Sequence, residues 1–129
     1  MIRYTSILML LTLGIGTNAF SQLPGTKRTD LQKSDLTAKG WEVIQAKVDI
    51  EEGVFAPRHS HPGEEVVYVI AGVFEYQLDG QEPVTLKAGD VLFIPANAVH
   101  SAKNVGRGTA SELATYIVEK GKPLLVLAK

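Results

Sequence analysis

GVFAPRHSHPGEEVVYVIAG, residues 53–72, is the stretch of sequence that decides both the fold and the site. His59 and His61 are two residues apart, so on a β-strand both imidazoles project from the same face. Glu65 keeps that parity if the strand continues. If Pro62-Gly63 forms a turn, Glu65 instead opens the next antiparallel strand and points back into the same space. Either geometry brings two imidazoles and a carboxylate together.

Two nitrogen donors and one oxygen donor suit a divalent transition metal rather than the all-oxygen shell that Ca²⁺ and Mg²⁺ prefer. The candidates are Fe, Mn, Ni, Cu and Zn, and the identity of the ion stays open. A structural zinc site would favour cysteine, and the chain has none. On spacing alone, the pattern fits equally well a polar strand face in contact with water.

The third and last histidine lies in a second informative stretch, GDVLFIPANAVHSAKN at residues 89–104. Together the two stretches resemble the two motifs of the cupin family. The first motif is met at every position, by Gly53, His59, His61, Glu65 and Gly72. The second is met by Gly89, Pro95, His100 and Asn104, while its inner glycine is replaced by Asn97. Asn tolerates a left-handed backbone better than most residues, so the turn expected there is retained.

The resemblance implies a jelly-roll (cupin) β-barrel with one divalent metal ion inside. The ligands that it implies are His59, His61, Glu65 and His100. Four protein ligands leave two positions of an octahedron for water, oxygen or a bidentate ligand. Cupins that resemble this chain include dioxygenases, decarboxylases, isomerases and lyases, because one fold hosts many functions.

From this we predict a small metalloenzyme of the dioxygenase type, an oxidoreductase that acts on a small chelating organic substrate. Two alternatives stay open. One is a non-catalytic cupin that binds a small molecule or the metal itself, and the other is a metal-dependent lyase or isomerase. No second acid/base or nucleophile motif identifies catalytic side chains, so none is assigned.

The rest of the chain is typical of an all-β domain. Alternating or Val-rich runs predict strands over residues 44–50, 65–70, 73–78, 84–86, 91–94 and 112–118. Asp79-Gly80 is typical of a tight hairpin turn, and no convincing amphipathic helix is present. Strand parity with His59 and Glu65 suggests that Phe55, Val67 and Val69 line the cavity beside the metal. The same parity turns Arg58 to the opposite face.

The chain divides into three expected parts. Residues 1–21 resemble a signal peptide, with a basic start, an apolar run and a small-x-small site formed by Ala19 and Ser21. Residues 22–39 lack a sustained period and are interpreted as an arm that packs on a partner subunit. Residues 40–129 are expected to form the cupin β-barrel domain. The protein is therefore predicted to be periplasmic or secreted.

Composition limits the partners. The formal net charge is −1 and the chain has no long block of one charge, so no nucleic-acid partner is expected on electrostatic grounds, and no membrane contact is expected after signal cleavage. The expected partners are a small-molecule substrate or ligand and a second copy of the chain in a homodimer.

Overall fold

The computed structural model describes residues 23–129, and the predicted signal peptide lies outside them. The described residues form ten strands and no helix, which confirms the all-β prediction. The strands are β1 (Thr26–Asp35), β2 (Trp41–Ile50), β3 (Phe55–Ser60), β4 (Gly63–Ala71), β5 (Val73–Leu78), β6 (Val84–Lys87), β7 (Val91–Ile94), β8 (His100–Asn104), β9 (Ala110–Glu119) and β10 (Val126–Leu127). Within residues 23–129, no helix has the length and hydropathy needed to span a membrane.

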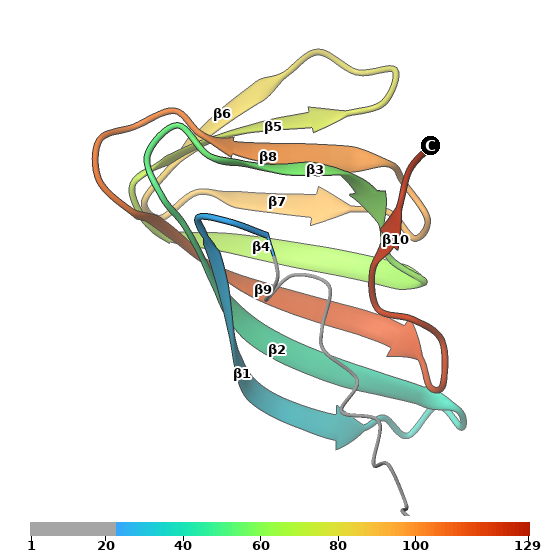
Figure 1. The fold of residues 1–129 in the computed structure, drawn as a ribbon. Helices are drawn as coiled ribbons and strands as arrows, with labels where there is room; N and C mark the ends of the chain where they lie inside the picture. Colours follow the sequence, from blue (N-terminus) through green and yellow to red (C-terminus); the bar gives the residue numbers. More distant parts are fainter. Residues whose placement is uncertain (1–22) are drawn as a thin grey trace, which may run out of the picture.

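Two five-stranded antiparallel sheets pack face to face, as Figure 1 shows. One sheet has the order β1-β2-β9-β4-β7 and the other the order β10-β3-β8-β5-β6. Strand alternation divides each sheet into a core face and a solvent face. In β2 the buried apolar side chains are Ala46, Val48 and Ile50, and the buried side chains of β5 are Phe74, Tyr76 and Leu78. The period-two pattern thus places one apolar core between the sheets.

The prediction of an arm at residues 22–39 is wrong for residues 26–35, which form the edge strand β1. β1 pairs with β2 from Thr26 opposite Ile50 to Asp35 opposite Glu42, with a bulge between Asp30 and Gln32. Most side chains of β1 are exposed and polar, so no apolar alternation marks the strand in the sequence. Backbone pairing with the edge of β2 is enough to make it a strand, and the sheet therefore begins well before residue 40.

The turn before β8 contains the residue that departs from the cupin motif. Asn97 has φ 62°, a left-handed conformation, and it is the non-glycine residue of the described chain with a positive φ. Its N–H donates a hydrogen bond of 3.0 Å to the carbonyl of His61. The prediction that Asn fulfils the turn role of glycine is confirmed, and the turn also ties the two histidine-bearing segments together.

Asn104 organises the turn at the other end of β8. Its side-chain N–H groups donate to the carbonyls of Ile50 (2.9 Å) and Gly108 (2.7 Å), and its side-chain oxygen accepts from Gly106 N–H (3.0 Å). The residue is 1% exposed. These bonds give Asn104 a structural role, because they satisfy buried polar groups that water does not reach.

Candidate metal centre

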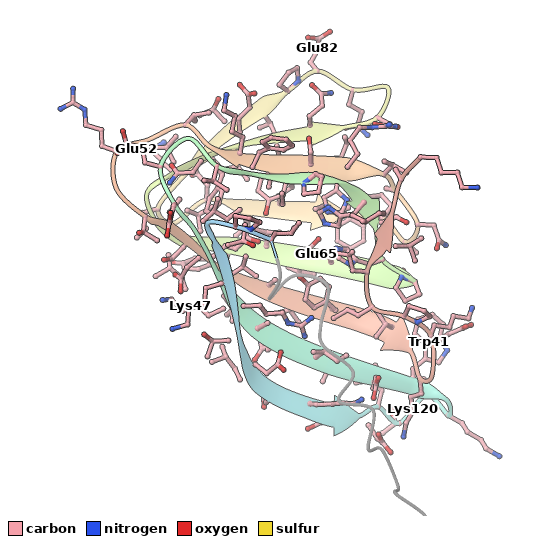
Figure 2. The ribbon with its side chains drawn as sticks, in the orientation of Figure 1. Trp41, Lys47, Glu52, Glu65, Glu82 and Lys120 are labelled. Carbon is pink, nitrogen blue, oxygen red and sulfur yellow. The ribbon has the colours of Figure 1, made fainter. Side chains whose placement is uncertain are left out.

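The four predicted ligands come together between the two sheets. His59 lies on β3 and is paired in register with His100, the first residue of β8. His61 follows β3 in the short connection to β4, and Glu65 lies on β4 in the facing sheet. Each of the four residues is at most 3% exposed, and Figure 2 shows Glu65 in the space between the sheets. The turn at Pro62-Gly63 that opens β4 is thus the geometry adopted.

Main-chain carbonyls orient the three imidazoles. The Nδ1 atoms of His59 and His61 lie 2.6 Å from the carbonyls of Pro57 and Leu124, and Nδ1 of His100 lies 2.9 Å from the carbonyl of Ala98. A carbonyl only accepts, so each Nδ1 carries the hydrogen and each neutral ring keeps its lone pair on Nε2. Hydrogen bonds of this kind fix the tautomer and direction of histidine ligands in metal sites.

The ring nitrogens of the three histidines converge. One ligand atom from each histidine lies within 4.8 Å of the corresponding atoms of the other two. Oε2 of Glu65 lies 3.2 Å from Nε2 of His61 and 3.2 Å from Nε2 of His100. Both His61 Nε2 and Glu65 Oε2 are buried and form no hydrogen bond within the described chain.

This arrangement fits a cation. A neutral imidazole with its hydrogen on Nδ1 presents only a lone pair to Glu65. In both 3.2 Å contacts, therefore, a ring nitrogen and a carboxylate oxygen face each other as two hydrogen-bond acceptors. Ligands at right angles on one ion with bonds of about 2.1 Å are about 3 Å apart. An ion between these atoms would satisfy both orphaned acceptors at the separations that the side chains already have.

The protonation states suit the same role. Burial, followed by repulsion from His100, lowers the pKa of His59 to about 4. Burial alone would raise the pKa of Glu65, but interaction of its carboxylate with a proton and positive charge on His100 and His61 outweighs this and lowers that pKa to about 2, and a cation held between these groups would act in the same direction. At neutral pH, therefore, His59 is neutral and Glu65 is ionised, which are the forms that bind metals.

Two tyrosines that the sequence did not identify as site residues border the histidines. The Tyr116 ring lies 4.7 Å from the His61 ring, and Tyr116 is paired across β9 and β4 with Glu65. The Tyr76 ring stacks near His100, with centroids 6.4 Å apart and an interplanar angle of 24°. Both residues are 1% exposed, so they exclude water from this side of the centre. The only sequence signal for Tyr116 is its inward parity on β9.

A buried acid lies beyond Tyr76. The Tyr76 hydroxyl, on one sheet, donates a hydrogen bond to Oε2 of the Glu112 carboxyl group, on the other. Glu112 is 4% exposed and is paired with Val48 and Val69 on its two neighbouring strands. Burial, and then the charge on Glu65, raise the pKa of Glu112 to about 8. Glu112 is therefore protonated at neutral pH.

The predicted cavity lining needs one correction. Val67 and Val69 are fully buried on β4, on the same face as Glu65. Phe55 is 59% exposed, so the prediction that it lines the interior is wrong. The cause is an irregularity in β3 between Ala56 and His59, which reverses the parity before the histidines. Arg58 points outward as expected and forms a bidentate ion pair with Asp79.

A family model described as "Cupin domain" matches residues 46–118. The dimethylsulfoniopropionate lyase DddQ of Ruegeria pomeroyi is 34% identical over 55 residues, which cover 43% of this chain and 27% of that protein. An oxalate-binding protein of Thermotoga maritima is 32% identical over 74 residues, which cover 57% of this chain and 60% of that protein.

Among solved structures, an oxalate oxidase matches with a TM-score of 0.66 and 23% identity, over 88% of this chain and 61% of that one. This likeness supports the fold alone. The chain spans less than two thirds of the two curated relatives named above. Their activities therefore apply to this chain only as proposals.

Proposed function

The chain belongs to the cupin family, and on that premise we propose that its four converging donors hold one divalent transition metal ion. The donors are His59, His61, Glu65 and His100. The observation that carries the proposal is the pair of buried, unsatisfied acceptors, His61 Nε2 and Glu65 Oε2, which face each other at 3.2 Å. The nitrogen and oxygen donor set favours Fe, Mn, Ni, Cu or Zn.

A small organic carboxylate is the proposed ligand class. A divalent ion with one ionised Glu65 leaves a net charge of about +1 in a buried site, which favours a monoanionic group. Two of the relatives at more than 30% identity agree with this, since one is named as an oxalate-binding protein and the other as a dimethylsulfoniopropionate lyase. Both compounds are carboxylates.

The chain's own residues position the metal ligands and exclude water from the site. Carbonyls of Pro57, Leu124 and Ala98 hold the imidazoles in one direction, and Tyr76 and Tyr116 keep water from one side. When bound, the metal supplies Lewis-acid polarisation and, if redox-active, electron transfer. We propose dioxygenase-type chemistry on a chelating substrate, with lyase chemistry as the second candidate because of the match to a lyase.

Reconstitution with single metals tests this proposal. The stripped protein is loaded separately with Fe(II), Mn(II), Ni(II), Cu(II) and Zn(II), and then incubated with small carboxylates, catechols, flavonols and β-diketones. Oxygen uptake and substrate loss are followed together. We expect oxygen-dependent turnover with a redox-active metal and none in Glu65→Ala. Substrate loss without oxygen uptake would favour the lyase, and binding without turnover would reject an enzymatic role.

We also propose that the protein is a homodimer. Five exposed apolar side chains lie together on the outer surface of β4 and β7, namely Val66, Tyr68, Ile70, Val91 and Phe93, which we call the β4–β7 face. Val66 is paired with Phe93 and Tyr68 with Val91, so the face is continuous across the two strands. A contiguous exposed apolar patch of this kind is typical of a protein interface.

A charge placed in this face should dissociate the dimer. We expect Phe93→Glu to raise the dimer dissociation constant by about thirtyfold or more, because an anchor residue at an interface contributes about 2 kcal/mol or more. Val105→Glu is the matched control, since Val105 is apolar and exposed but lies outside the face. Sedimentation equilibrium measures both. A wild-type mass equal to the monomer at every concentration would contradict the proposal.

We further propose that the protein acts in the periplasm or outside the cell, on the basis of residues 1–21. An exported chain folds after export, so its site would fill from the ions available there, where affinity favours Cu and Zn. Mass spectrometry of the native protein tests the export step, with a mature chain beginning at Gln22 as the expected result and an intact Met1 as the contradicting one.

A further inference from the structure

A cavity of about 650 Å³ opens beside the metal centre, between the inner surface of β1 and β2 and the segment that follows β9. Its volume is within the range of small-molecule sites. The residues that matter for its chemistry are Arg28, Asp30, Lys33, Glu42, Lys122 and Leu124. None of the four candidate metal ligands lines this cavity.

Arg28 is the unusual group in the wall. It is paired with Val48, whose side chain lies in the core, so Arg28 also faces inward. The Arg28 side chain is only 6% exposed. Its Nε lies 2.8 Å from Asp30 Oδ1, but the atoms lack hydrogen-bond geometry, and Nε has no hydrogen-bond partner within the described chain. A buried guanidinium with this donor unsatisfied is costly unless a ligand completes it.

The cavity touches two supports of the metal centre. The Arg28 guanidinium lies 5.8 Å from the centroid of the Tyr116 ring, and that ring lies 4.7 Å from His61. Leu124 lines the cavity, and its carbonyl accepts the hydrogen bond from Nδ1 of His61. One layer of residues therefore separates the cavity from a metal ligand.

The charges of the wall select the kind of ligand. Three cations and two acids line the cavity, and two of the cations are already paired. Lys33 is already paired with Glu42 at 3.1 Å, and Lys122 is paired with Glu119 outside the cavity lining. The acid next to Arg28, Asp30, is 64% exposed and therefore solvated. A planar carboxylate fits the guanidinium fork of Arg28, whereas a phosphate dianion would bring a second negative charge that no unpaired cation of the wall compensates.

We propose that this cavity binds a carboxylate group of a small organic acid and that Arg28 is the side chain that recognises it. The inference rests on the proposed function, because it extends ligand recognition from the metal ion to a second group next to it. Arg28 is then a determinant of specificity, and Asp30 is a competitor for its guanidinium.

Titration calorimetry of the metal-loaded protein tests the proposal. The protein is loaded with Zn(II), its metal content is measured, and acetate, propionate, butyrate and succinate are titrated alongside uncharged propionamide. We expect at least one carboxylate to bind the wild type and propionamide to bind much more weakly. Arg28→Gln should weaken carboxylate binding by about tenfold or more while metal content is unchanged, since a charged hydrogen bond is lost.

Two further variants complete the experiment. Arg58→Gln, an exposed arginine outside this cavity, should bind like the wild type. The Asp30 side chain is mostly exposed, so the Asp30→Asn variant should fold normally. It should bind the carboxylate severalfold more tightly, because the acid that competes for Arg28 is removed. Equal affinity in Arg28→Gln and wild type, no tightening in Asp30→Asn, or no carboxylate binding at all would overturn the inference. Absence of bound metal in the wild type would instead reject the proposed function.

Discussion

His59→Ala/His61→Ala protein will contain less than about a tenth of the metal found in the wild type, which should hold about one ion per chain. Removing two of four ligands leaves one imidazole and one carboxylate, too few for a stable site with nitrogen and oxygen donors. Elemental analysis after dialysis against free metal measures the loss. Arg58→Ala is the matched control, because Arg58 directly precedes His59 on β3 and is exposed, paired with Asp79.

Metal binding should also raise the free energy of unfolding. A ligand that binds only the folded chain at 100 times its dissociation constant adds about 2.7 kcal/mol to the free energy of unfolding. A chelator should therefore lower the melting temperature of the wild type and leave that of the double variant unchanged. Equal metal content in the double variant and the wild type would exclude these histidines as ligands.

Glu112→Gln should make the metal-free protein more resistant to alkaline pH. The pKa of Glu112 is raised from 4.5 to about 8 in the folded chain, first by burial. Its contribution to stability is complete below pH 4.5 and is lost as the pH rises through about 8, because the unfolded chain releases this proton earlier. The amide can still accept from the Tyr76 hydroxyl but has no proton to lose.

The expected magnitude is large. The free energy of unfolding of the variant, minus that of the wild type, should rise between pH 5 and pH 8. The rise should be as much as about 4 kcal/mol, at 1.36 kcal/mol per pH unit. Urea unfolding at several pH values in the presence of a chelator measures this difference. Glu82→Gln is the control, since Glu82 lies exposed at the β5–β6 turn (Figure 2). A difference that does not vary with pH would show that Glu112 is ionised in the folded chain.

Spacing in the sequence was enough to predict that His59, His61 and Glu65 meet, because two histidines two residues apart and a turn at Pro62-Gly63 specify backbone directions. His100 was added to this set by the resemblance to the cupin motifs. The strands with apolar alternation, such as residues 73–78, were also predicted from spacing, since burial of one face sets the period.

Other features depend on contacts that no local pattern encodes. β1 has no apolar alternation because it is an edge strand, and Phe55 points outward because a bulge changes the parity of β3. The Leu124 carbonyl that orients His61 is 63 residues away in the chain. The bond between Tyr76 and Glu112 joins two sheets, so parity shows that both point inward but not that they meet.

The most direct test of the central claim is an anomalous difference map from crystals of the metal-loaded protein, collected at the absorption edge of the bound metal. The proposal predicts one peak per chain, about 2.0–2.3 Å from Nε2 of each histidine and from a carboxylate oxygen of Glu65. A peak held by other residues, or no peak between these side chains in protein that contains one metal ion per chain, would contradict it.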